Sequence, residues 1–159
     1  MTLERKSALR LQFLARVVRK ECRHLVSTDL RLFNTPFTVE VVVRLETDQE
    51  LAGRVEAFVG RFGRLQDTVG DKLLPQLLYA LGEKLSSALD NLDRAERLGL
   101  IKSADEWAIM RSLRNQMVHE YVEEPALLAD ALQAAHSFVP DLVVAADRMI
   151  SEIERRGWA

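Results

Sequence analysis

Apolar residues recur every three or four positions along nearly the whole chain, which is the spacing of amphipathic α-helices. The first such stretch runs from about Leu3 to Val26, and the polar residues 27–29 that follow it can end or cap a helix. Its apolar stripe consists of Leu11, Leu14, Val17, Val18, Cys22 and Leu25. This pattern predicts a long first helix that buries one face.

Residues 37–45 come after a break at Asn34-Thr35-Pro36 and contain a cluster of valines. Valine favours β-strands, but no second segment of the chain offers a strand that could pair with this one. We therefore predict a short helix here.

The next helical stretch is long. Thr47-Asp48-Gln49-Glu50 places acidic side chains in its first turn, and the apolar period continues to about Leu78. Pro75 is placed to bend the helix, and Leu81-Gly82 ends it.

Four glycines lie inside this long helix, although each one costs about 1 kcal/mol relative to alanine in a helix interior. They form two pairs with seven-residue spacing, so the members of a pair return to roughly one face. Two explanations account for these glycines equally well. Either a neighbouring helix or subunit comes close to the helix at these positions, or the glycines are neutral substitutions at exposed positions. The four are Gly53, Gly60, Gly63 and Gly70.

Three more helical stretches complete the pattern, and short connections join them. They are residues 86–98, closed by Gly99; a stretch opened by a capping box from Ser103 to Glu106 and reaching Tyr121; and a last one from Pro125 towards Arg155, with Pro140 as a possible kink. Helices with short connections form an antiparallel bundle most economically. We expect an all-α protein, a four-to-five-helix bundle in which residues 1–159 make one domain.

Composition supports this class. A chain of 159 residues is long enough for one real hydrophobic core, and 48% hydrophobic with 29% charged residues is typical of a globular protein. Seven glycines and four prolines are too few for a turn-rich β-sandwich.

The net charge of −2 hides a gradient along the chain. Residues 1–31 contain eight lysines and arginines against three acidic residues, whereas residues 120–159 contain eight acidic residues against three arginines. A basic segment attracts phosphates, but ordinary solvated helix faces have the same composition. Both interpretations remain open at this point.

The single cysteine, Cys22, excludes an internal disulfide and a multi-cysteine zinc site. No apolar run approaches the roughly 20 residues that cross a bilayer, and charged residues interrupt the N-terminal segment where the apolar core of a signal peptide would lie. No pair of histidines, or histidine and carboxylate, has metal-ligand spacing. The expectation is a cytoplasmic protein with no membrane partner, metal or cofactor.

Residues 111–121 are the most informative stretch for chemistry. On a helix, Met110, Leu113 and Met117 share one face, which we assign to the core, while Arg111, Asn115 and His119 follow one another along the polar side. Arg114 lies at the edge of the apolar face and diverges from His119 by about 140°. Two copies of the helix across a two-fold axis, or a local helix bulge, would bring these two groups together.

An arginine and a histidine can cleave an RNA phosphodiester bond without a metal. The guanidinium binds phosphate and neutralises developing charge, and the imidazole moves a proton near neutral pH. On the residue types alone, Arg114 and His119 are more often ordinary surface or helix-end residues, with His119 complementing the helix dipole. His24 and His136 have no such neighbours and are interpreted as structural.

The pattern Arg114-x4-His119-x-Tyr121 resembles the RX4HXY signature of the HEPN domain family, and in particular the HepT-type toxins that are paired with minimal nucleotidyltransferase antitoxins. The similarity is strongest over residues 103–124, and the surrounding helices suit the all-helical layout of that family.

The resemblance implies a function for each matching residue. Arg114 and His119 correspond to the ribonuclease pair, and Asn115 to the polar residue that commonly follows the arginine. Tyr121 corresponds to the tyrosine that the partner nucleotidyltransferase modifies with AMP from ATP. It also implies a homodimer whose two motifs line one cleft, acting on RNA.

Arg61, Arg64 and Asp67 share a face at three-residue spacing. Arg61 and Arg64, together with Arg111, could contact further phosphates, and the carboxylate of Asp67 could orient an arginine. An exposed ladder of ion pairs explains the same spacing equally well. Two rival functions stay open: a non-catalytic helical subunit that holds a nucleotide or substrate for a nucleotidyltransferase, and a pure dimerisation scaffold.

Overall fold

Every regular element in the described residues, 3–119 and 124–158, is helical in the computed structural model. The elements are α1 (Arg5–Leu32), α2 (Val39–Val43), the 3₁₀ turn η1 (Arg44–Glu46), α3 (Gln49–Asp67), the π-helical segment η2 (Thr68–Leu73), α4 (Leu74–Ala80), α5 (Ala88–Arg97), α6 (Ala104–His119) and α7 (Pro125–Arg155). The prediction of an all-α fold is confirmed.

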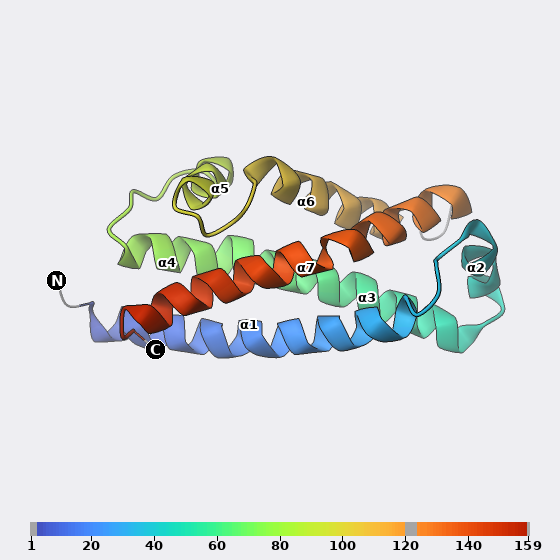
Figure 1. Cartoon of the computed structure of the whole chain (residues 1–159), viewed down its shortest axis with the longest axis horizontal. Helices are drawn as coiled ribbons and strands as arrows, with labels where there is room; N and C mark the ends of the chain where they lie inside the picture. Colours follow the sequence, from blue (N-terminus) through green and yellow to red (C-terminus); the bar gives the residue numbers. More distant parts are fainter. Residues whose placement is uncertain (1–2, 120–123, 159) are drawn as a thin grey trace.

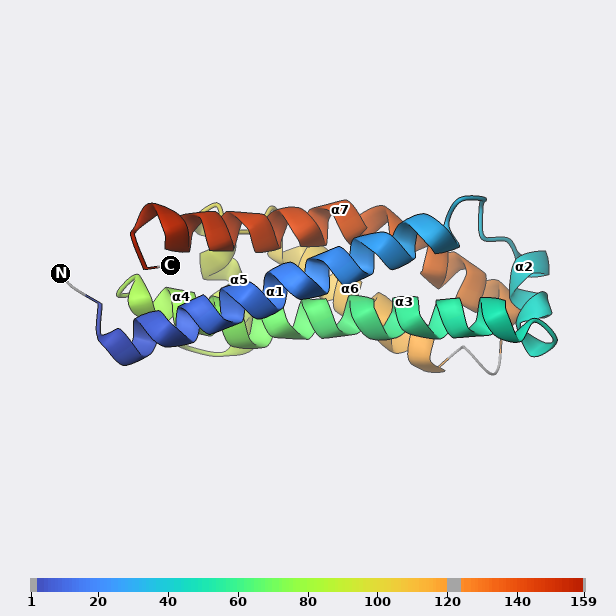
Figure 2. The same cartoon turned by 90° about the horizontal axis from the view of Figure 1, so that it is seen from below.

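Four long rods form an antiparallel bundle (Figures 1 and 2). They are α1, the continuous rod α3–η2–α4, α6 and α7. The α1 helix contacts both the α3–η2–α4 rod and α7, and α6 contacts the same two rods from the other side, so α1 and α6 lie diagonally opposite. The short helices α2 and α5 lie in the connections between rods (Figure 1).

The core follows the predicted apolar stripes. On α1, Leu11, Leu14, Val18 and Leu25 are buried, while Val17 is only partly so. Burying one such side chain contributes about 1.5–3 kcal/mol. Cys22 lies in the same core, and burial, reinforced by Asp147 and Glu21, raises the pKa of its thiol to about 12. The thiol is therefore protonated at neutral pH.

The predicted end of the first helix at Val26 is wrong, because α1 continues to Leu32. The expected capping residues are used inside the helix instead. Thr28 is buried and its hydroxyl donates to the backbone carbonyl one turn earlier. Asp29 lies 2.7 Å from Nδ1 of His136 on α7. Contacts with another helix have overridden the local preference of these residues for a helix end.

The predicted bend at Pro75 takes the form of a π-helical segment, η2, directly before α4. Proline has no amide hydrogen and its ring collides with the carbonyl of the residue four positions earlier in a regular α-helix. The wider turn of a π-helix removes this conflict while the rod continues. Pro75 itself then lies in the first turn of α4.

The shorter elements agree with the sequence. The valine-rich segment 37–45 forms α2, whose N-terminus is capped by Thr38. The stretch predicted over 86–98 forms α5, and Gly99 follows it with φ of +76°, a backbone conformation that favours glycine.

The last helix, α7, begins with Pro125 in its first turn, as predicted, and runs through Pro140 without interruption. By length and apolar composition alone α7 could cross a bilayer, contrary to the expectation that no segment is apolar enough. Core helices of soluble proteins pass the same test, and one face of α7 is buried against α1 and α6.

The four glycines of the long rod divide evenly between the two explanations. A Cβ added at Gly53 or Gly60 would meet nothing within 4 Å. A Cβ at Gly63 would lie 3.0 Å from Nε of Arg114, and one at Gly70 would lie 3.0 Å from Nε1 of Trp107. Only the latter pair marks positions where α6 comes close to the rod.

Replacing Gly70 and Gly53 by alanine should therefore have opposite effects on stability. We expect Gly70→Ala to lower the free energy of unfolding by about 1–2 kcal/mol, because the new methyl group meets the rigid, buried indole of Trp107. Gly53→Ala should raise it by about 0.5–1 kcal/mol through helix propensity alone. Urea unfolding followed by circular dichroism measures both. Equal effects of the two substitutions would contradict the close approach at Gly70.

Candidate functional site

The helix that contains the Arg–His pattern, α6, starts and buries its apolar face as predicted. The hydroxyl of Ser103 accepts a hydrogen bond of 3.1 Å from the backbone amide of Glu106, as an N-cap does. Met110, Leu113 and Met117 are all buried. The opposite side of α6 is therefore available for polar side chains.

Arg114 lies across the α3 helix. Its side chain passes over Gly63, which leaves room for it, and its Nη2 atom is 3.4 Å from Oδ2 of Asp67. Because Gly63 and Asp67 are one turn apart, they contact the same side of α3. The Arg114 side chain is 38% exposed. The ion pair with Asp67 thus orients the partly exposed guanidinium group of Arg114 at the surface.

Arg111 forms a second ion pair between α6 and the α3–η2–α4 rod. We call the contact made by Arg111 and Arg114 with Asp71 and Asp67 the Arg114 seam. Its Nη2 atom donates a hydrogen bond of 3.1 Å to Oδ1 of Asp71 in η2. Arg111 is one turn from both Asn115 and Arg114 on the regular α6 helix, so it belongs to the edge of the predicted polar face and reaches the rod beside Arg114.

Asn115 and His119 are exposed, and His119 is the last residue of α6. The helix remains a regular α-helix up to that residue, so no bulge in the described part of α6 turns the imidazole towards Arg114. Within one chain the two groups keep the divergence expected of a regular helix. Tyr121, the expected AMP acceptor, lies outside the described residues.

Arg61 and Arg64 lie on the other flank of α3, towards α1. The guanidinium of Arg61 donates to the hydroxyl of Thr28 and, at 3.4 Å, to the carbonyl of His24. Arg64 is exposed and close enough to Glu21 of α1 to lower the pKa of that carboxyl. Arg61 thus has its hydrogen bonds on α1, whereas Arg114 has its ion pair with Asp67 of α3.

Glu21 is the carboxylate of this second flank. Its partial burial against the rod raises its pKa above the usual range, and this effect outweighs the hydrogen bond of 3.2 Å from the Thr68 hydroxyl and the charges of Arg64 and Lys72. The charge of Asp67, the partner of Arg114, adds to this increase in the pKa of Glu21, so the α1 flank of α3 lies next to the seam that Arg111 and Arg114 form with Asp71 and Asp67.

Gly63, one of the glycines for which the sequence suggests close approach of a neighbouring helix, provides the space for Arg114. Sequence reasoning missed two further residues of the Arg114 seam. Asp71 pairs with Arg111, and the buried amide of Gln66 donates a 3.2 Å hydrogen bond to the carbonyl of Trp107, which fastens the start of α6 to α3. One signal was available. Asp67 and Asp71 are one turn apart, as are Arg111 and Arg114, which is the spacing of two helices that pair their charges.

The two ion pairs preorganise the arginines at modest energetic benefit. Each arginine and each carboxylate is between about one third and one half exposed, so water and salt screen the pairs. A bound phosphate group could therefore accept hydrogen bonds from either guanidinium without a large energetic penalty. Among residues 3–119 and 124–158, no group of three or more histidine, cysteine and acidic side chains is arranged to hold a metal.

Comparison of the chain with protein-family models, with curated proteins and with solved structures finds no match.

Proposed function

We propose that this chain is a HepT-like toxin of the HEPN family, a metal-independent endoribonuclease of the cytoplasm that works as a homodimer. In this proposal a partner nucleotidyltransferase silences it by attaching AMP to Tyr121. The proposal depends on the position of Arg114. Its side chain lies over Gly63, pairs with Asp67 and remains partly exposed. The exposed His119 follows five residues later on the same helix.

The reaction needs one acid, one base and one cation. The 2′-hydroxyl oxygen of the RNA attacks the adjacent phosphorus, which forms a 2′,3′-cyclic phosphate and breaks the bond to the 5′ oxygen of the next nucleotide. One His119 imidazole accepts the proton of the 2′-hydroxyl, and a protonated His119 gives a proton to the departing 5′ oxygen. Arg114 neutralises the negative charge that accumulates on the phosphoryl oxygens.

A homodimer supplies the convergence that one chain lacks. Because α6 is regular, Arg114 and His119 of one copy point in different directions. A two-fold axis between two α6 helices would place the arginine of each copy near the histidine of the other and provide both imidazoles at once. Asn115 and Arg111 would contact the flanking phosphates. We assign Arg61 and Arg64, which face α1, to more distant RNA contacts.

Modification of Tyr121 would act through charge and bulk. The phenolic oxygen attacks the α-phosphorus of ATP, pyrophosphate leaves, and the tyrosine keeps the AMP group. Its phosphate would lie two residues from His119 in the sequence and would compete with RNA for the arginines. The positively charged cleft is thereby occupied by the chain's own modified residue.

A glycine substitution tests the proposal without removing a reacting group. We expect Gly63→Ala to lower cleavage of a labelled single-stranded RNA by about 10- to 100-fold, because the new Cβ displaces the Arg114 side chain and misaligned groups lose rate steeply. The matched control is Gly60→Ala, whose Cβ meets nothing. Product ends are analysed for 2′,3′-cyclic phosphate, in the presence of a metal chelator.

The same assay separates the rival functions. A chain that binds the RNA or a nucleotide but yields no product under any condition is a non-catalytic subunit of a nucleotidyltransferase complex. A chain that neither binds nor cleaves is a dimerisation scaffold. Full activity of Gly63→Ala would overturn the role given to the position of Arg114.

A further inference from the structure

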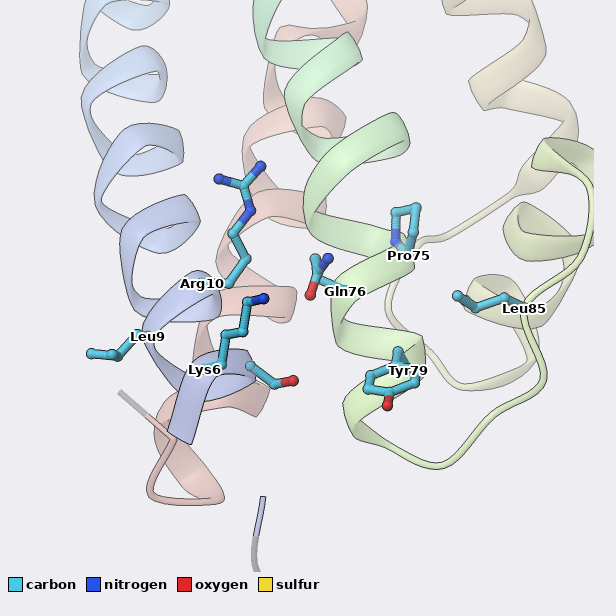
Figure 3. Close-up of a pocket in the computed structure, with 8 residues that line it drawn as sticks. Lys6, Leu9, Arg10, Pro75, Gln76, Tyr79 and Leu85 are labelled. Carbon is cyan, nitrogen blue, oxygen red and sulfur yellow. The ribbon is translucent and has the colours of Figure 1, made fainter. Parts of the chain in front are cut away.

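A pocket with a volume of about 620 Å³ lies between the start of α1 and α4. Its walls come from α1, from α4 and from the loop that follows α4 (Figure 3). It shares no residue with the seam of Arg111 and Arg114, and nothing in the proposed ribonuclease chemistry uses it. Pockets of this size suit small organic ligands.

The charge of this pocket is one-sided. Lys6 and Arg10 line it from one face of α1, one helical turn apart, and no acidic residue is among the lining side chains. Figure 3 shows both side chains, with Gln76 of α4, in the space between the two helices. Two neighbouring cations without a carboxylate match an anion with nearly two negative charges, which is the charge of a phosphate monoester at neutral pH.

Apart from Ser7, the rest of the lining is apolar and includes an aromatic ring. Pro75 and Tyr79 are one turn apart on α4, and Leu85 reaches towards Pro75 from the loop (Figure 3). The Tyr79 side chain is unusually open for an aromatic residue, at 57% exposed. An exposed ring beside apolar side chains is a surface on which a flat aromatic group stacks.

We propose that this pocket binds a small phosphate monoester that carries an aromatic group. Lys6 and Arg10 hold the phosphate, and the side chains of Pro75, Tyr79 and Leu85 hold the aromatic group. The Gln76 amide, which both donates and accepts hydrogen bonds, contacts the polar edge between them. The site is a second binding site, independent of the proposed ribonuclease.

Titration of the full-length protein with phenyl phosphate tests this inference. Binding should be saturable by calorimetry and should shift the backbone amide NMR signals of residues 6–10 and 76–79. Inorganic phosphate and phenol, which each present half of the ligand, should bind at least about tenfold more weakly, a factor that corresponds to about 1.4 kcal/mol. Arg10→Gln and Tyr79→Ser should each lower the affinity for phenyl phosphate by a similar factor.

The matched control is Arg16→Gln, which removes an exposed charge of α1 outside the pocket and should leave the affinity unchanged. The three side chains to be replaced are at the surface, and circular dichroism verifies that each variant folds. The proposal is overturned if phenyl phosphate does not bind, if inorganic phosphate binds equally well, or if Arg16→Gln weakens binding as much as Arg10→Gln. None of these outcomes depends on RNA cleavage.

Discussion

His119→Ala is expected to reduce RNA cleavage by about 10²- to 10⁴-fold, the usual contribution of a general acid or base. The imidazole is exposed at the end of α6, so its removal leaves the core and the bundle intact. In a homodimer both copies lose the group, and both proton transfers suffer. Initial cleavage rates of a labelled RNA, measured with chelator present, give the effect, and circular dichroism verifies the fold.

His24→Ala is the matched control for this prediction. His24 is another exposed histidine, on α1. Its backbone carbonyl accepts hydrogen bonds from Thr28 and Arg61, and alanine keeps this carbonyl. Its replacement should leave cleavage unchanged. Undiminished cleavage by His119→Ala would remove the imidazole from the mechanism, whereas equal losses in both variants would point to a general effect of surface charge.

Tyr121→Phe should abolish modification by the partner nucleotidyltransferase altogether. The phenolic oxygen is the only atom of Tyr121 that can attack the α-phosphorus of ATP, and phenylalanine lacks it. After incubation with ATP and the nucleotidyltransferase, the intact mass of the unaltered chain should rise by whole AMP units. The RNA cleavage rate of that sample should fall at the same time.

The chain offers a convenient control for this second experiment, because it contains two tyrosines and the other one is the exposed Tyr79. Tyr79→Phe should gain the same mass as the unaltered chain. A gain in Tyr121→Phe would show that another residue accepts AMP. A gain at Tyr121 without loss of RNA cleavage would separate the modification from control of the ribonuclease.

The helical period allowed most elements to be predicted from the sequence. Residues one turn apart must share a face, so the buried stripes of α1 and α6 follow from local spacing. Helix-start signals locate the beginnings of α3 and α6 to within a few residues, and Pro125 locates that of α7, because such signals depend on neighbouring backbone atoms.

Predictions failed where a remote helix supplied the contact. Thr28 and Asp29 look like the end of a helix, yet α1 continues because α3 and α7 provide partners for them. The matched spacing of Asp67 and Asp71 with Arg111 and Arg114 is compatible with two ion pairs, but local spacing does not decide which two helices pack side by side.

The all-α class, the order of the helices and the five-residue separation of an arginine from a histidine can all be obtained from the sequence alone. These properties depend on interactions within a few residues, which spacing and residue type describe. The packing of the helices is needed to place Arg114 over Gly63 beside Asp67, to turn Arg61 to α1, and to form a basic pocket beside α4. Those outcomes depend on how remote helices pack against one another, and packing is a property of the whole bundle.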